Sequence, residues 1–258
     1  MPRRSVRLDA GRPPDPVEVA PRIHRLGEEI INSYLVEDGG AVTIVDAGAP
    51  AYWASLPSVL GEMGRTLGDV RAVLLTHGHT DHIGFAQAAH EAGIPVRVHE
   101  ADAALARQEV PNPSRGFGPL KPMPLLRFLV YGARRGLFRI PKLQEVGTFG
   151  DGATLDVPGA PTVVLVPGHT PGSAALHFPG HDALFTGDAL ATYAVTTGRS
   201  GPQLAPFTAD EPAALESLRR LEGIDASLVL PGHGAAWHLG ARAAVEAVRA
   251  SEVSRHLR

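Results

Sequence analysis

The chain has no cysteine among its 258 residues. This absence excludes disulfides, thiolate zinc sites, iron–sulfur clusters and cysteine nucleophiles, so any bound metal must be held by nitrogen and oxygen. The chain also lacks an apolar run long enough to span a bilayer, and no apolar segment follows its basic N-terminus as in a signal peptide. We therefore expect a cytoplasmic protein that does not contact a membrane.

Neither sign of charge is in large excess. The chain has 24 Lys and Arg against 27 Asp and Glu, for a formal net charge of -3. This balance argues against nucleic acid as a partner. An apolar fraction of 44% is typical of a globular chain.

Short strand-like segments alternate with helical segments along most of the chain. Strands are expected at 17–26, 30–36, 41–45, 70–75 and 95–99, in pieces over 146–155, and at 162–166, 173–178, 183–186 and 227–230. Helices are expected at 51–63, 82–92, 101–109, 211–221 and from about residue 239 onward. This alternation predicts a mixed α/β layer architecture. We expect a flexible arm at 1–16 and a single domain over 17–258.

Residues 111–140 form a lid-like insertion that is rich in proline, apolar residues and basic residues. Three interpretations stay open: a helix packed on the domain edge, a lid or wall of a substrate pocket, and contact with a membrane surface. The last is the least favoured, because basic and apolar residues are not cleanly segregated along the segment. The final helix similarly could pack on a sheet or support a homodimer.

Three histidines and one aspartate stand close together in the run THGHTDH at 76–82. These are His77, His79, Asp81 and His82. Burying such groups without partners is costly, and a divalent metal is a suitable partner for all of them. Asp81 taken alone could instead cap a helix.

Four further candidate residues follow predicted strands, in loops rich in glycine or proline. They are Asp46, His169 in Pro-Gly-His-Thr-Pro-Gly, Asp188 in Thr-Gly-Asp and His233 in Pro-Gly-His-Gly. Ligand sites are commonly built on such loops, although each residue could also serve only its turn. His24 and His238 are weaker candidates for pocket lining.

The candidate metal ligands are too numerous for one zinc ion. Five imidazoles and two carboxylates exceed the roughly four ligands that one zinc takes, so they predict two ions about 3.5–4 Å apart. The set comprises His77, His79, Asp81, His82, His169, Asp188 and His233.

The order of these motifs resembles that of the metallo-β-lactamase superfamily, as do Ile30–Leu35 and Ile44–Gly48. The resemblance implies a four-layer αββα sandwich, with two mixed β-sheets flanked by helices and the metals at one edge. It implies two ligand sets: His77, His79 and His169 on the first metal, and Asp81, His82 and His233 on the second, with Asp188 as a bridge. Asp46 corresponds to the carboxylate that orients a histidine ligand. The expected ions are Zn²⁺, with Fe²⁺ or Mn²⁺ as alternatives.

A hydroxide bridging two such ions is a nucleophile at neutral pH. It would attack the carbonyl of a small-molecule substrate, with Asp81 orienting it and one ion stabilising the oxyanion. Tyr193 is a further catalytic candidate, because some lactonases of the superfamily carry a tyrosine shortly after the bridging aspartate. The spacing here differs, and ordinary packing of Tyr193 is the alternative.

We predict a zinc-dependent ester, thioester or lactone hydrolase. Asp188 argues against true β-lactamases, which usually lack a carboxylate at that position. The 25 residues after His233 are too few for the C-terminal domain of glyoxalase II. A tRNA-gripping arm, as in ribonuclease Z-like nucleases, is a poor match to 111–140.

Other reactions of the same superfamily stay open. A mononuclear Fe(II) persulfide-dioxygenase-like oxidoreductase would use His77, His169 and Asp188 as its triad. A phosphodiesterase or nuclease is a further alternative. A non-enzymatic metal-binding protein would be expected to have a broken ligand set, whereas this one is whole.

Overall fold

The computed structural model describes residues 17–114, 116 and 118–256, so the arm predicted at 1–16 lies outside the described residues. The strands are β1 (Val17–Ala20), β2 (Ile23–Glu28), β3 (Ile31–Asp38), β4 (Ala41–Val45), β5 (Val70–Leu74), β6 (Val96–His99), β7 (Gly147–Phe149), β8 (Thr162–Leu165), β9 (Ala174–Phe178), β10 (Ala183–Gly187), β11 (Ala191–Tyr193), β12 (Ser200–Gln203) and β13 (Leu228–Pro231). The α-helices are α1 (Tyr52–Glu62), α2 (Ala86–Glu91), α3 (Ala103–Ala106), α4 (Pro122–Arg135), α5 (Glu211–Ser217) and α6 (Gly240–His256). Short 3-10 helices cover Leu67–Asp69, Glu100–Asp102, Pro179–His181 and Leu218–Leu221.

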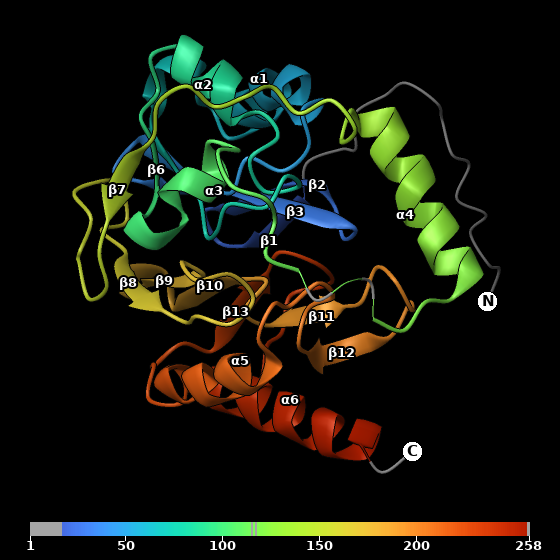
Figure 1. Cartoon of the computed structure of the whole chain (residues 1–258). Helices are drawn as coiled ribbons and strands as arrows, with labels where there is room; N and C mark the ends of the chain where they lie inside the picture. Colours follow the sequence, from blue (N-terminus) through green and yellow to red (C-terminus); the bar gives the residue numbers. More distant parts are fainter. Residues whose placement is uncertain (1–16, 115, 117, 257–258) are drawn as a thin grey trace, which may run out of the picture.

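These elements stack in four layers (Figure 1). Helices α1 and α2 cover one face of a first sheet, a second sheet lies against its other face, and α5 and α6 cover the outside of the second sheet. The first sheet has the order β1-β2-β3-β4-β5-β6-β7, antiparallel up to β4 and parallel beyond it. The second has the order β13-β10-β9-β8, with only β13 and β10 parallel. The predicted αββα sandwich with two mixed sheets is therefore confirmed.

The central strands are apolar on both faces because each sheet is covered on both sides. In β10, Phe185 belongs to the core between the two sheets, whereas its neighbour Leu184 packs with the core that includes α5 and α6. In β3, Tyr34 belongs to the core between the sheets and Leu35 to the core that includes α1 and α2. Four layers thus enclose three apolar cores, and the loops at the sheet edges remain available for polar side chains.

Several boundaries differ from the sequence-based expectation. The strand predicted over 17–26 is split into two, because Pro21 and Arg22 form a turn in which Arg22 has φ 64°. The helix predicted over 82–92 begins only at Ala86, because the preceding residues form the loop that carries the histidine cluster. The small hairpin β11–β12 was not predicted at all.

The described part of the insertion contains one α-helix, α4, at the edge of the molecule (Figure 1). It begins with Pro122, whose missing N–H leaves no hydrogen bond unmade at that position, and it ends at Arg135, followed by Gly136 as a C-cap with φ 84°. The C-terminal helix α6 buries Ala244, Val245 and Val248 in the core that includes the second sheet, in line with its packing interpretation. No helix in the described part of the chain is long and apolar enough to cross a membrane.

Candidate metal centre

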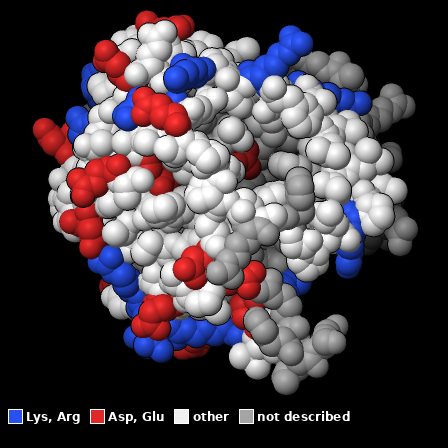
Figure 2. All heavy atoms as spheres, in the orientation of Figure 1, with Lys and Arg blue, Asp and Glu red and all other residues white. Residues whose placement is uncertain are grey.

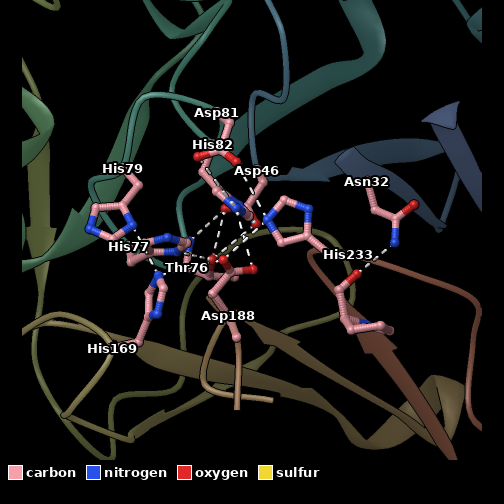
Figure 3. Close-up of polar contacts among 12 residues, drawn as sticks. Asn32, Asp46, Thr76, His77, His79, Asp81, His82, His169, Asp188 and His233 are labelled. Carbon is pink, nitrogen blue, oxygen red and sulfur yellow. Dashed lines mark hydrogen bonds and ion pairs between the residues drawn. The ribbon is translucent and has the colours of Figure 1, made fainter. Parts of the chain in front are cut away.

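Loops from both sheets bring the predicted ligands together (Figure 3). The THGHTDH run follows β5, His169 follows β8, Asp188 follows β10 and His233 lies just after β13. These histidines and Asp188 are buried, whereas the side chain of Asp81 is 20% exposed. Residues more than 150 positions apart in the sequence thus share one site because their strands end at the same edge.

Three groups of ligand atoms converge, each with its atoms within 4.8 Å of one another. The groups are His77–His79–His169, His77–His82–Asp188 and Asp81–His82–His233. The first and third coincide with the two ligand sets that the resemblance implied. Asp188 lies between them: its Oδ2 is 3.1 Å from Nε2 of His233 and 3.4 Å from Nε2 of His169, and its Oδ1 is 3.5 Å from Nε2 of His82.

The donor atoms at this centre suit a divalent cation. Nε2 of His77, Nε2 of His82 and Oδ1 of Asp188 are buried and have no hydrogen-bond partner among the described residues. Nδ1 of His79 lies 2.9 Å from Nε2 of His169, and Nε2 of His79 also lacks a partner among those residues. A buried polar group without a partner costs about 1–3 kcal/mol, so several that converge on one point fit a metal site. The nitrogen and oxygen donors suit zinc and its first-row neighbours.

Asp46 orients two of the histidines from behind. Its carboxylate accepts hydrogen bonds from the backbone N–H of Thr76 at 2.7 Å and from the Thr76 hydroxyl, and it lies 2.8 Å from Nδ1 of His82. Because a carboxylate only accepts, His82 carries its proton on Nδ1 here and presents Nε2 to the centre. The Thr76 oxygen in turn lies 3.0 Å from Nδ1 of His77, which donates to it.

His169 and His233 are also oriented by hydrogen bonds from their Nδ1 atoms. Nδ1 of His169 lies 3.1 Å from the hydroxyl of Thr208, which donates to the carbonyl of Ala205 at 2.8 Å. Nδ1 of His233 donates to the carbonyl of Ile30. In each case Nε2 is left to face the centre, as expected for histidine ligands held by partners outside the metal sphere.

Asp102 is a structural member of the site that the sequence analysis missed. It is fully buried, and its Oδ2 accepts from the backbone N–H of Gly78 at 2.9 Å and from the hydroxyl of Thr170 at 2.7 Å. Its Oδ1 accepts from the backbone N–H of Gly172 at 2.7 Å. One carboxylate thus ties the loop of His77 and His79 to the loop of His169. The available signal was its position shortly after β6, like the other candidates after their strands.

The turn that carries His233 is held by Asn32 of β3 (Figure 3). The Asn32 amide donates to the carbonyls of Pro231 and Gly234, both at 2.8 Å. Gly232 lies so close to the ligands that a Cβ there would be 2.5 Å from both Oδ1 of Asp188 and Cε1 of His82. Only glycine permits this approach.

The fold and this arrangement agree with known proteins. A profile of the metallo-beta-lactamase superfamily matches residues 26–233. The chain belongs to the metallo-β-lactamase superfamily.

Several curated proteins resemble the chain over more than half of its length. An uncharacterized protein of Mycobacterium tuberculosis is 34% identical over 227 residues, which cover 81% of this chain and 88% of that one. The probable metallo-hydrolase YflN of Bacillus subtilis is 29% identical over 255 residues, 91% of this chain and 90% of that one. The hydroxyacylglutathione hydrolase of Fuscovulum blasticum is 32% identical over 160 residues, but these cover only 61% of this chain and 47% of that enzyme.

Among solved structures, the metallo-beta-lactamase family protein TTHA1429 of Thermus thermophilus has a TM-score of 0.66 and 27% identity. The match covers 92% of this chain and 81% of that one. Together these similarities establish the fold and a metallo-hydrolase superfamily for the chain, with a His and Asp centre that could bind metal.

The histidines of the two candidate ligand sets differ in their protonation state. Burial lowers the pKa of His77 well below its ordinary value, with the neighbouring His82 adding to the effect. Burial likewise lowers the pKa of His169 to about 3, with a contribution from His79. These two imidazoles are therefore neutral at physiological pH, which is the form that binds a metal.

The second ligand set behaves in the opposite way. Burial opposes a charge on His233, but the carboxylates of Asp188 and Asp81 outweigh it and raise its pKa to about 10. The pKa of His82 is also raised despite burial, with Asp46 as the strongest carboxylate influence. Without metal, both imidazoles carry a proton that a metal would have to displace.

The remaining predicted residues lie outside the three ligand groups. Tyr193 ends β11, and its hydroxyl has no hydrogen bond to any described residue; the preceding Thr192 donates from its backbone N–H to the carbonyl of His233 at 3.0 Å. His24 lies in β2 and His238 is exposed. Asp81 does not cap a helix, because the residue that precedes α2 is Phe85.

Proposed function

We propose that this chain is a zinc-dependent hydrolase with a binuclear centre that acts on an ester, thioester or lactone carbonyl. The observation that carries the proposal is the position of Asp188, whose two oxygens lie 3.1–3.5 Å from histidines of both ligand sets. A mononuclear centre would not need the second set of candidate ligands, Asp81, His82 and His233. A relative named as a probable metallo-hydrolase and one named as a hydroxyacylglutathione hydrolase support a hydrolytic reaction.

Bound Zn²⁺ ions, or Fe²⁺ or Mn²⁺ in their place, would supply a nucleophilic hydroxide near neutral pH and a Lewis acid for the substrate carbonyl. The chain contributes the geometry. His77, His82 and His169 are locked in position by hydrogen bonds from their outer nitrogens. Such preorganisation avoids the cost of rearranging ligands during the reaction.

Asp81 is suited to handle the attacking water. Its side chain is 20% exposed, whereas the other proposed ligands are buried, so it lies where the centre meets solvent. Burial favours the neutral acid, but His82 and His233 outweigh it and hold the pKa of Asp81 below its ordinary value. The carboxylate is therefore ionised and able to accept a hydrogen bond from water.

Tyr193 is our proposed proton donor or orienting group for the leaving oxygen or sulfur. Replacing it with phenylalanine removes only the hydroxyl, which has no hydrogen-bond partner among the described residues. We expect turnover to fall about 100-fold with metal content unchanged, which is typical of a lost acid–base group. Unchanged turnover would refute this role.

Metal analysis combined with a substrate screen tests the proposal as a whole. Elemental analysis of the purified protein is expected to give two divalent ions per chain. In a screen of lactones, thioesters, phosphodiesters and β-lactams, hydrolysis is expected for lactones or thioesters and not for phosphodiesters or β-lactams. Asp188→Asn is expected to lose the two-ion stoichiometry, whereas the exposed Asp225→Asn is the matched control.

Three outcomes would contradict the proposal. One iron per chain with oxygen uptake would favour the persulfide-dioxygenase-like alternative. Hydrolysis of phosphodiesters alone would favour a nuclease. Retention of two ions by Asp188→Asn would remove the argument for bridging.

A further inference from the structure

The outer face of α4 is unusually apolar for a solvent-exposed helix. Ten large hydrophobic residues are exposed in the described part of the chain, and six of them lie between positions 120 and 138. The six are Leu120, Met123, Leu126, Leu129, Val130 and Phe138. Met123 and Phe138 are 73% and 66% exposed, respectively. Grouped exposed apolar side chains of this kind mark an interaction surface.

The orientation of α4 is set by its inner face. Tyr131 is buried and its hydroxyl bonds to that of Tyr52, which donates to the carbonyl of Ile31 at 2.8 Å. Arg135 donates to Glu28 at 2.9 Å. The apolar outer face therefore cannot be buried by rotating the helix without breaking these contacts.

On the outer face, Met123, Leu126 and Val130 follow one another at intervals of three and four residues, so they form one continuous stripe. Arg127 and Arg134 lie beside this stripe and are exposed. Along the sequence the basic and apolar residues looked mixed, but the fold places the apolar ones together on the outside with arginines along their flank.

The charge of this segment is one-sided. From Val110 to Gln144 the sequence has no aspartate or glutamate and seven basic residues, although the whole chain carries a formal charge of -3. The basic residues are Arg115, Lys121, Arg127, Arg134, Arg135, Arg139 and Lys142. Figure 2 shows uncharged side chains over the region of α4, with Lys and Arg at its edges.

We propose that the outer face of α4 docks onto an anionic lipid surface, with the helix lying in the plane of the interface. The apolar stripe would enter the boundary of the acyl chains, while Arg127 and Arg134 keep their stems along it and reach the lipid phosphates or carboxylates. The expectation of no membrane contact was based on the lack of a spanning segment, which does not bear on a surface helix.

The arginines beside the stripe favour an anionic lipid surface over a second copy of the chain as the binding partner of α4. Two antiparallel copies of α4, packed with Met123 of each copy against Val130 of the other, would bring Arg127 of one copy close to Arg127 of the other, where like charges repel. An anionic surface makes the same arginines favourable. The docking does not depend on the metal centre, so it stands or falls separately from the proposed hydrolase activity.

Vesicle co-sedimentation of the full chain tests the proposal. We expect binding to phosphatidylcholine vesicles that contain phosphatidylserine, weaker binding to phosphatidylcholine alone, and loss of binding as salt is raised. Each arginine near such a surface contributes about fivefold, so Arg127→Gln with Arg134→Gln is expected to weaken binding about 30-fold. Met123→Gln, Leu126→Gln and Val130→Gln together are expected to weaken it about 100-fold on both lipid mixtures.

Matched controls use exposed residues elsewhere. Leu239→Gln with Val253→Gln removes exposed apolar side chains, and Arg71→Gln with Arg242→Gln removes exposed charges. Both controls should bind like the wild type. If circular dichroism shows that the triple variant is unfolded, the test is decided by the variant with Arg127→Gln and Arg134→Gln, which changes only exposed side chains.

Three results would overturn the proposal. The first is no added binding to vesicles that contain phosphatidylserine. The second is equal binding by the wild type and both α4 variants. The third is a dimer in light scattering that the triple variant converts to a monomer, which would assign the stripe to a second copy.

Discussion

Asp102→Asn is the most direct test of how the fold holds the candidate centre. The carboxylate is fully buried and accepts three hydrogen bonds, from the backbone N–H groups of Gly78 and Gly172 and from the hydroxyl of Thr170. Asparagine has nearly the same shape but replaces one acceptor oxygen with a donor. Whichever way the amide turns, one backbone N–H faces another donor, while the Thr170 hydroxyl can rotate.

The magnitude follows from these three bonds. A hydrogen bond to a charged group contributes about 1.5–3 kcal/mol, and a buried donor without an acceptor costs about 1–3 kcal/mol. The loss of one such bond, with weakening of the others as the charge disappears, gives a decrease of about 3–5 kcal/mol in the free energy of unfolding. With a urea dependence of about 3 kcal/mol/M for a domain of this size, the midpoint should fall by about 1–1.7 M.

Urea unfolding followed by circular dichroism measures this change, and competition with a chelating dye measures metal affinity. Because Asp102 joins the loops of the first ligand set, we also expect affinity to fall about 10–100-fold. The exposed Asp225→Asn serves as the control and should change neither quantity. If Asp102→Asn unfolds within about 0.5 kcal/mol of the wild type and binds metal equally, the reasoning about this carboxylate is wrong.

Three further predictions concern the ligands themselves. Asp46→Asn leaves a single acceptor oxygen where the backbone N–H of Thr76 and Nδ1 of His82 each need one, so metal affinity measured with the same dye should fall about 10–100-fold, and an unchanged affinity would contradict the orienting role. Gly232→Ala places a methyl group 2.5 Å from Cε1 of His82 and should reduce the bound metal in elemental analysis, whereas Gly223→Ala, with no atom within 4 Å, should not. Because the pKa of His233 is raised to about 10 and that of His82 is also raised, both hold protons near neutral pH in the metal-free protein. Metal addition in weak buffer should therefore release protons to an indicator dye, affinity should rise with pH toward about 10, and the absence of proton release would show that neither imidazole is displaced.

The candidate ligands could be selected from sequence because each has a local signature. His77, His79 and His82 form a cluster that is costly without a cation, and His169, Asp188 and His233 each stand beside glycine just after a strand. The long apolar runs of the central strands similarly predict a sheet buried on both faces. Both signals reside in residues that are neighbours along the chain.

Other features have no such signature. Asp102 resembles any aspartate near a short helix until the fold places two backbone N–H groups and a hydroxyl around it. The start of α2 at Ala86 is set by the ligand loop before it, which periodicity does not record. The two strands of the hairpin β11–β12 have only three and four residues, which is too few to show an alternation of apolar and polar residues.

The sequence by itself determined which donor groups are present: candidate nitrogen and oxygen ligands without thiolates, their order along the chain, and the layered α/β class. Only the tertiary structure decided which ligands face one another, that Asp188 lies between both sets, and that the apolar residues of α4 point outward. The physical reason is that ligand identity and strand periodicity are local properties. Convergence of side chains and exposure of a helix face instead depend on how distant segments pack.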